Sequence, residues 1–270
     1  DQSFNRHVID FDDLSLDRAH SWPELLAIVR ERVLPVRAQL KDHGVDLGHK
    51  QRWWQFANPR PELRAALAGR TRCLVAPRVT KHLTFAFQPT DRVFSDQLCV
   101  FALDGYDSFA LLQSRLHESW ARLHSSTLGE GLRYTPSDSV ETFVPPHPWR
   151  RRHDRLHGIG ERLYHARARH LIASRLGLTQ VYNQIADRSC RTEPVLELRH
   201  LHEELDRAAL DAYGWHDLTV PPICPTESAE QEQLDAFRDE VVQRLYDLNQ
   251  KAAESPGHQA IIPVEPATPG

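Results

Sequence analysis

The stretch RCLVAPRVTKHLTFAFQPTDRVFSDQLCVFAL, from Arg72 to Leu103, decides the fold class. It holds three short apolar runs, separated by turn-forming and charged residues, at 72–77, 82–88 and 97–103. In the second run Leu83, Phe85 and Phe87 alternate with polar or small residues, which is the period-two pattern of a half-buried strand. The sequence therefore predicts three neighbouring β-strands at the centre of the chain.

Helical periodicity surrounds these strands on both sides. Apolar residues at helical spacing predict helices over about 22–40, where Pro35 should bend or break the helix, and over 62–68 and 108–123. Four further apolar stripes follow, at 156–163, 178–185, 198–212 and 234–248. The predicted fold class is α+β, with a mixed α/β domain followed by a C-terminal helical bundle.

Composition shifts suggest where the parts divide. A Ser-, Gly- and Pro-rich segment ends in Pro145-Pro146-His147-Pro148, which is typical of a domain boundary. We expect a spacer helix over 1–48, a mixed domain over 49–148, a helical domain over 149–254 and a disordered tail over 255–270. The 270 residues contain no methionine, which suggests a fragment or processed piece.

The same composition limits the class of protein. No apolar run is long enough to span a membrane and no signal peptide opens the sequence, so we expect a soluble, cytoplasmic protein without a membrane partner. The four cysteines form no close pair, which argues against a cysteine zinc site or a disulfide framework. The histidine pairs at 153/157 and 200/202 lack a third ligand at suitable spacing. We expect no metal and no cofactor in this chain.

Charge is distributed unevenly along the sequence. Between positions 50 and 81 there are eight lysines and arginines against one acidic residue, Glu62, whereas 196–250 has four arginines against thirteen acidic residues. One part should attract polyanions and the other should repel them.

Catalytic motifs are absent from the printed sequence. There is no glycine-rich turn after a strand for S-adenosylmethionine and no Asn-Pro-Pro-Tyr element for a flipped base. None of the four lysines has an acidic residue two positions before it, which excludes the common PD-(D/E)xK nuclease motif. We expect no catalytic residue here.

The basic segment has the chemistry of a DNA-binding surface, which needs cations for phosphates and hydrogen-bonding side chains for base edges. A solvated charged face explains the same arginines equally well. Trp53, Trp54 and Phe56 fit either stacking on bases or, more commonly, a core. The run Arg150–Arg152 fits either a phosphate contact or a charged linker. The candidate DNA-binding residues are Arg52, Arg60, Arg70, Arg72, Arg78, Lys81, His82, Arg133 and Tyr134.

Several long stretches resemble one protein family. They are HVIDF (7–11), ERVLPVR (31–37), RWWQF (52–56), RPELRAALAG (60–69), RVTKHLTFAF (78–87), the segment 93–143, and LRHLHEELDRAALDAYGWHDL (198–218). Together they resemble the part after the catalytic domain in MmeI/Eco57I-like (type IIL/IIG) adenine-specific DNA methyltransferases of restriction-modification systems. Residues 139–145 depart from the family, which usually has a cysteine, an aromatic residue and Phe-Pro there.

The resemblance implies that 49–148 is a target recognition domain with double-stranded DNA as its partner. It further implies that a separate catalytic domain performs N6-adenine methylation with S-adenosylmethionine, in a restriction-modification or phage-defence system. An alternative is a free-standing specificity subunit that docks a separate methyltransferase chain, and a third is a structural helical adaptor with an incidental basic face.

Overall fold

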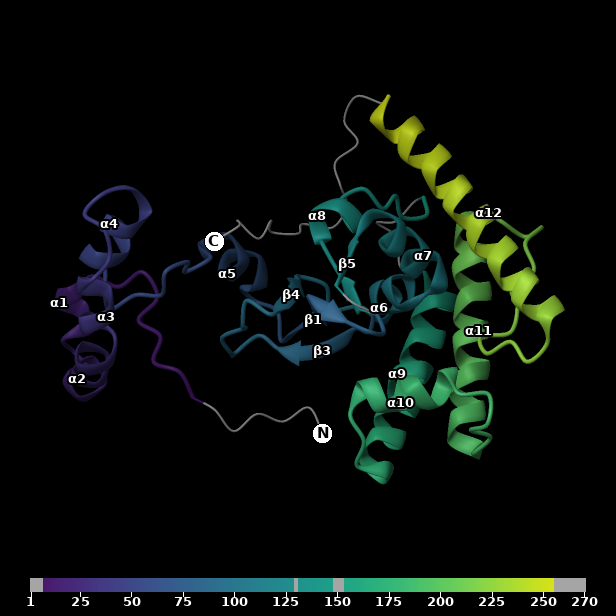
Figure 1. The fold of residues 1–270 in the computed structure, drawn as a ribbon, viewed down its shortest axis with the longest axis horizontal. Coiled ribbons are helices and arrows are strands. Elements are labelled where there is room, and N and C mark those ends of the chain that lie inside the picture. Colours follow the sequence, from purple (N-terminus) through teal and green to yellow (C-terminus); the bar gives the residue numbers. More distant parts are fainter. Residues whose placement is uncertain (1–6, 129–130, 148–152, 255–270) are drawn as a thin grey trace. The chain divides into compact units, whose positions relative to one another are not determined.

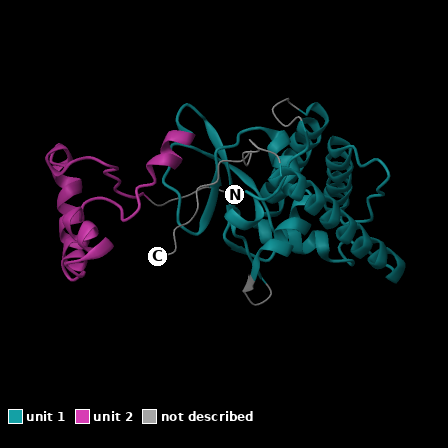
Figure 2. Ribbon diagram, turned by 90° about the horizontal axis from the view of Figure 1, so that it is seen from above, with its two compact units in different colours: residues 1, 67–270 teal, residues 2–66 magenta. Residues whose placement is uncertain are grey.

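The computed structural model describes residues 7–128, 131–147 and 153–254. The chain divides into two compact units, Gln2–Ala66 and Leu67–Gly270, shown in magenta and teal in Figure 2. Each unit has its own hydrophobic core. The predicted tail over 255–270 and the run Arg150–Arg152 lie outside the described residues.

The unit 2–66 consists of short helices. These are α1 (Leu16–Ala19), α2 (Pro23–Arg32), α3 (Leu34–Ala38), α4 (Gly44–Gln51) and the start of α5 (Pro61–Leu67). The predicted helix over 22–40 is divided in two, and Pro35 lies in the first turn of α3, where a missing N–H costs nothing. Trp53 is buried with Phe11 and Leu26, and the indole of Trp54 donates to the Leu14 carbonyl at 2.8 Å. Both tryptophans therefore make contacts inside this unit.

The three predicted strands form one antiparallel sheet. Strand β1 (Arg72–Pro77) is central, with β3 (Ala86–Pro89) on one side and β4 (Leu98–Phe101) on the other. The bounds of β1 match the prediction. The second predicted strand is shorter than expected because β3 begins only at Ala86.

Side chains from two helices occupy the outer edge of the segment around β3. Gln113 accepts from the Phe85 N–H at 3.0 Å and donates to the Leu83 carbonyl at 3.1 Å. The Tyr164 hydroxyl accepts from the Phe87 N–H at 3.2 Å, and Arg167 donates to the Phe85 carbonyl at 2.6 Å. Backbone groups that a further strand would pair with are thus satisfied by side chains.

A second small sheet lies partly within the Ser-, Gly- and Pro-rich segment that was expected to mark a domain boundary. Strand β6 (Gly131–Arg133) is central, with β2 (Val79–Thr80) and β5 (Ser126–Leu128) paired antiparallel on either side, and α8 (Pro136–Ser139) follows. Local composition could not show this pairing, because β2 lies far away in sequence.

The predicted helix over 108–123 is two helices, α6 (Tyr106–Gln113) and α7 (Arg115–His124). Ser114 separates them with an extended backbone, and its hydroxyl accepts from the His117 N–H as the N-cap of α7. The helical spacing of the apolar residues continues across the break, and both helices bury these residues in the same core.

Four helices follow, as predicted: the long helices α9 (Asp154–Ser174), α11 (Glu193–Tyr213) and α12 (Ser228–Ala253), and the short α10 (Leu178–Ala186) (Figure 1). Helix α9 packs against both α6 and α11. One core runs from Leu74 on β1 to Leu245 on α12, so the helices and the sheets belong to a single unit without a boundary at 148. The fold class is α+β, as predicted.

Candidate nucleic-acid interface

The pairing of β2 with β6 brings together basic residues that are distant in sequence. Val79 lies opposite Arg133, and Thr80 lies opposite Leu132. The Tyr134 N–H donates to the Arg78 carbonyl at 2.7 Å, which extends the pairing by one residue. Arg78, Lys81 and Arg133 therefore belong to the same corner of the unit.

One face of this sheet is exposed. Residues opposite each other on antiparallel strands point to the same side. Arg133 is exposed and Leu132 is buried, Val79 opposite Arg133 is 45% exposed, and Ser126 lies opposite Arg133 on the other side and is also exposed. The exposed row is thus Val79, Arg133 and Ser126, while Leu132 faces the core.

Cations on this face are available to a ligand. Neither the Arg133 guanidinium nor the Lys81 ammonium has a hydrogen-bond or ion-pair partner among the residues that the structure describes. Arg122, from α7, donates to the Lys81 carbonyl at 3.4 Å and pairs with Glu118 at 2.7 Å. The exposed set formed by Val79, Lys81, Arg122, Ser126 and Arg133 is called the β2–β6 surface below.

Sequence reasoning did not single out Arg122. In the sequence it is an exposed helix residue four positions after Glu118, which is the spacing of an ordinary i,i+4 ion pair. Only the folded chain shows that Arg122 reaches the backbone beside Lys81.

His82 connects this surface to α10. Its Nε2 lies 2.9 Å from the Asn183 Oδ1, and its ring lies 6.0 Å from that of Tyr182. His82 follows Lys81 directly, so the contact places α10 next to the β2–β6 surface.

Tyr134 was expected to contact a ligand, and the structure corrects this. Its side chain is 1% exposed, its hydroxyl lies 2.9 Å from the His117 Nε2, and its ring packs edge-on against Phe85. Burial raises the pKa of Tyr134 well above its ordinary value. Tyr134 is a core residue, because the β2–β6 pairing turns alternate side chains inward.

Arg78 is only partly available. Its Nε is buried and has no hydrogen-bond partner among the described residues, and it lies near the thiol of Cys99. Burial raises the pKa of Cys99 to about 11, while the positive charge of Arg78 acts in the opposite direction. The Cys99 thiol is therefore neutral and does not balance the charge of Arg78.

Arg70 and Arg72 lie at the opposite end of the first sheet. Arg72 begins β1 and Arg78 follows its end, so the two lie six residue steps apart, which in a strand is about 20 Å. The Arg72 guanidinium donates to the Asp104 carbonyl at 2.6 and 2.9 Å and lies 3.9 Å from the centre of the Phe87 ring. Arg70 pairs with the Asp104 carboxylate at 3.1 Å. These two arginines form a separate, internally bonded cluster.

The remaining candidates, Arg52 and Arg60, belong to the unit 2–66. Arg52 is exposed at the end of α4, and Arg60 has a left-handed backbone with φ of 54°. Two neighbouring cations of the basic run are neutralised, since Arg64 pairs with Asp10 at 2.6 Å and Lys50 with Asp42 at 2.7 Å. The basic run is thus divided between the two units and partly balanced by carboxylates.

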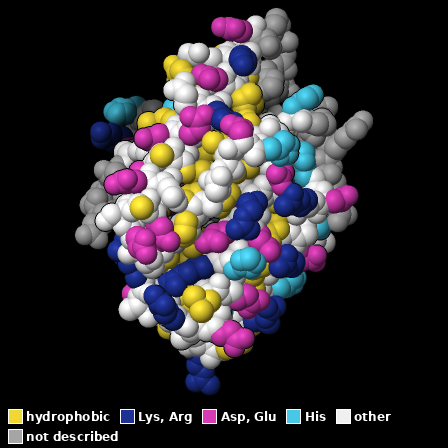
Figure 3. All heavy atoms as spheres, turned by 90° about the vertical axis from the view of Figure 1, so that its right-hand side faces the viewer, with side chains coloured by type: hydrophobic (Ala, Val, Ile, Leu, Met, Phe, Trp, Pro, Cys, Tyr) yellow, Lys and Arg dark blue, Asp and Glu magenta, His cyan; other side chains and the backbone are white. Residues whose placement is uncertain are grey.

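The acidic C-terminal part is balanced in a similar way. Arginines of α9 pair with carboxylates of α11, including Arg162 with Glu204 at 2.9 Å and Arg169 with Glu197 at 3.1 Å. Figure 3 shows the face that carries these helices, where acidic, basic and histidine side chains are interspersed. This face is mixed in charge.

Among residues 7–128, 131–147 and 153–254, no group of three His, Cys, Asp or Glu side chains is placed to hold a metal ion. No helix in the same ranges combines the length and the apolar character needed to cross a membrane.

Comparisons with known proteins give one likeness in fold. No protein-family model matches the chain, and no curated protein matches it. Among solved structures, the chain is similar to MmeI, a type IIL restriction-modification enzyme solved in complex with DNA, with a TM-score of 0.55 and 17% sequence identity. The match covers 88% of this chain and 28% of the MmeI chain, so the two share a related fold over a minor part of MmeI.

Proposed function

We propose that this chain is the sequence-specific DNA-recognition module of an S-adenosylmethionine-dependent N6-adenine DNA methyltransferase in a restriction-modification or phage-defence system. The observation that carries the proposal is the likeness over 88% of the chain to an enzyme solved with DNA. The β2–β6 surface supports it, because this surface presents unpaired cations on an exposed sheet face. Methyl transfer would belong to a catalytic domain joined to this one or carried by a separate chain.

The proposed surface has the two kinds of group that DNA recognition needs. Lys81 and Arg133 supply positive charge for phosphates, and each neutralised phosphate releases condensed counterions. Val79 and Ser126 flank Arg133 on the same face and offer an apolar and a hydroxyl group next to a guanidinium.

S-adenosylmethionine has no assigned residue in this chain. The printed sequence has neither the glycine-rich turn nor the Asn-Pro-Pro-Tyr element for that chemistry. The chain's own part in the reaction would be to bind the duplex and fix its register relative to the catalytic domain.

The experiment measures binding of the full chain to a fluorescein-labelled 30-base-pair duplex of random sequence, by anisotropy, between 50 and 200 mM KCl. We expect binding whose log affinity falls linearly with log salt concentration. The double variant Lys81→Ala/Arg133→Ala should bind more weakly and lower the salt slope by about 2, one for each lost phosphate contact.

A matched control removes two exposed arginines from the C-terminal helices. Arg207 pairs weakly with Glu203 on α11, and Arg238 with Asp235 on α12, so Arg207→Ala/Arg238→Ala removes the same charge elsewhere. The control should retain the wild-type slope. Absence of binding at 50 mM KCl, or an equal loss in both double variants, would overturn the proposal.

A further inference from the structure

Helix α10 differs in charge from its neighbours. Its nine residues, LTQVYNQIA, include no Asp, Glu, Lys or Arg, whereas α11 and α12 each carry several acidic residues and α9 carries two acidic residues and four arginines. Val181, Tyr182 and Ile185 are buried, and Thr179, Gln180 and Asn183 are exposed. The exposed face of α10 is therefore polar but uncharged, so it does not repel a phosphate backbone.

This face adjoins the β2–β6 surface. The bond between the His82 Nε2 and the Asn183 Oδ1 joins α10 to the residue directly after Lys81. The Tyr182 hydroxyl bonds to Arg167, whose guanidinium also donates to the Phe85 carbonyl, so α10 is fixed to the sheet from inside as well. The position of α10 relative to Lys81 is thus set by contacts on both sides.

The two exposed amides have free donors. The Asn183 Oδ1 faces His82 and the Gln180 Oε1 accepts from the Gly177 N–H at 2.9 Å, while neither amide nitrogen has a partner among the described residues. An amide N–H₂ group is a suitable donor to purine N7, guanine O6 or thymine O4 on a base edge. Because its oxygen is held by His82, the direction of the Asn183 amide is restricted before any ligand arrives.

We propose that α10 forms the second half of the DNA interface, and that Asn183, oriented by His82, donates to a base edge beside the phosphates bound by Lys81. This inference rests on the proposed function. It assigns base reading to a helix of the C-terminal part, where the sequence pattern singled out no candidate DNA-binding residue.

The test compares variants of the full chain by anisotropy, now with a duplex of the sequence that the wild-type chain selects from a randomised pool, because a base contact has no fixed partner in a duplex of random sequence. Asn183→Ala should weaken binding five- to tenfold without changing the salt slope, because a base contact and not a phosphate contact is lost. Gln180→Glu keeps an acceptor for the Gly177 N–H but adds a negative charge to the exposed face, and it should weaken binding at least tenfold at 50 mM KCl. The matched controls are Gln233→Ala and Gln233→Glu, at an exposed glutamine of α12. Both variants should bind within twofold of wild type.

A second readout distinguishes contacts to bases from non-specific binding to the DNA backbone. In selection from duplexes with a randomised 20-base-pair centre, Asn183→Ala should relax the preference at one position, whereas Lys81→Ala should weaken all sequences alike. Wild-type affinity and preference in Asn183→Ala, together with wild-type affinity in Gln180→Glu, would overturn the role of α10 and leave the proposed function standing. Failure of the wild-type chain to bind any duplex would overturn both.

Discussion

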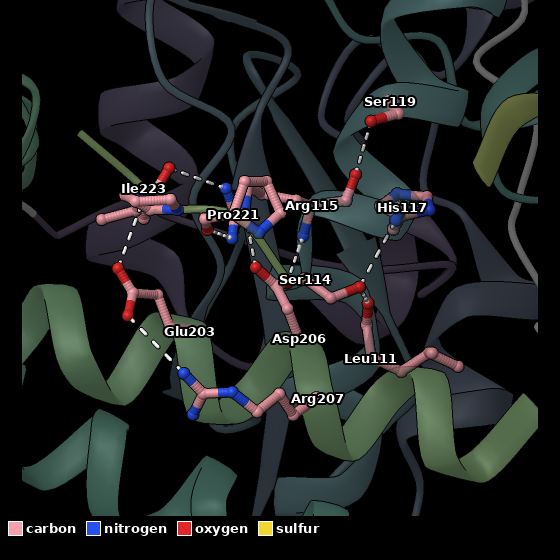
Figure 4. Close-up of polar contacts among 11 residues, drawn as sticks. Leu111, Ser114, Arg115, His117, Ser119, Glu203, Asp206, Arg207, Pro221 and Ile223 are labelled. Atoms are coloured by element: carbon pink, nitrogen blue, oxygen red, sulfur yellow. Dashed lines mark hydrogen bonds and ion pairs between the residues drawn. The ribbon is translucent and has the colours of Figure 1, made fainter. Parts of the chain in front are cut away.

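The carboxylate of Asp206 on α11 is held by Arg115, 91 positions earlier at the start of α7. The Arg115 backbone N–H donates to Oδ1 at 2.8 Å and its Nε donates to Oδ2 at 2.5 Å (Figure 4). The rest of the guanidinium donates to the carbonyls of Pro221 and Pro222 at 2.7 and 3.3 Å. Since both side chains are almost fully buried, the pair fixes α7, α11 and the segment before α12 to one another.

Removing one partner of this pair should destabilise the folded protein. We expect Asp206→Ala to lower the free energy of unfolding by about 3–5 kcal/mol, because Arg115 would remain buried with an unbalanced charge. Urea denaturation followed by circular dichroism measures the change. Asp235→Ala, which breaks the exposed pair with Arg238, should cost less than about 1 kcal/mol, and similar losses in the two variants would contradict the importance of burial.

Two glycines on α9 should respond in opposite directions to the same substitution. A Cβ at Gly160 would lie 2.2 Å from the Tyr106 carbonyl oxygen, so Gly160→Ala must push α9 away from α6 and should destabilise the protein by about 1–3 kcal/mol. A Cβ at Gly158 would meet no atom within 4 Å, so Gly158→Ala should stabilise the helix by up to about 1 kcal/mol. Thermal melting of the two variants measures the changes in stability. A change of melting temperature with the same sign in both would refute the close packing at Gly160.

Stability should fall as the pH drops from 7 to 5. Burial lowers the pKa of His117 and of His202 to about 3 from the ordinary value of 6.5. Below pH 6.5 the unfolded chain binds a proton at each histidine and the folded chain does not, so protonation favours unfolding. Each histidine should remove about 2 kcal/mol by pH 5.

Urea midpoints measured between pH 5 and 7 test this pH dependence. His202→Gln should remove one of the two protons that the chain takes up on unfolding. The slope of stability against pH should therefore fall by about half. A wild-type stability that is flat across this range would show that the two rings are not kept neutral by burial.

The local spacing of apolar residues predicted those helices and strands whose ends are marked by turn-forming or charged residues. Strand β1 matches its predicted ends because an apolar run lies between two arginine-containing turns. The break at Ser114 was missed because Phe109, Leu112 and Leu116 keep a helical phase through it. The second sheet was missed because β2 is two residues long and its partner lies far along the chain.

The candidate site was predicted in part, for a similar reason. Lys81 and Arg133 do lie on one exposed corner, but the charge count could not show that Arg64 and Arg70 are balanced by Asp10 and Asp104. Tyr134 resembles an exposed loop aromatic in sequence, and only its partner His117 on α7 shows that it is internal. Asn183 carried no signal, because its position depends on the contact with His82.

The side chains that occupy the outer edge of β3 also bear on whether a second molecule can add a strand to this sheet. An open sheet edge is a template onto which another chain can add a strand, which leads to aggregation. Because Gln113, Tyr164 and Arg167 already occupy the groups between Leu83 and Phe87, that template is closed. None of these three side chains belongs to the β2–β6 surface, so substitutions on that surface leave the protection of the first sheet at this edge in place.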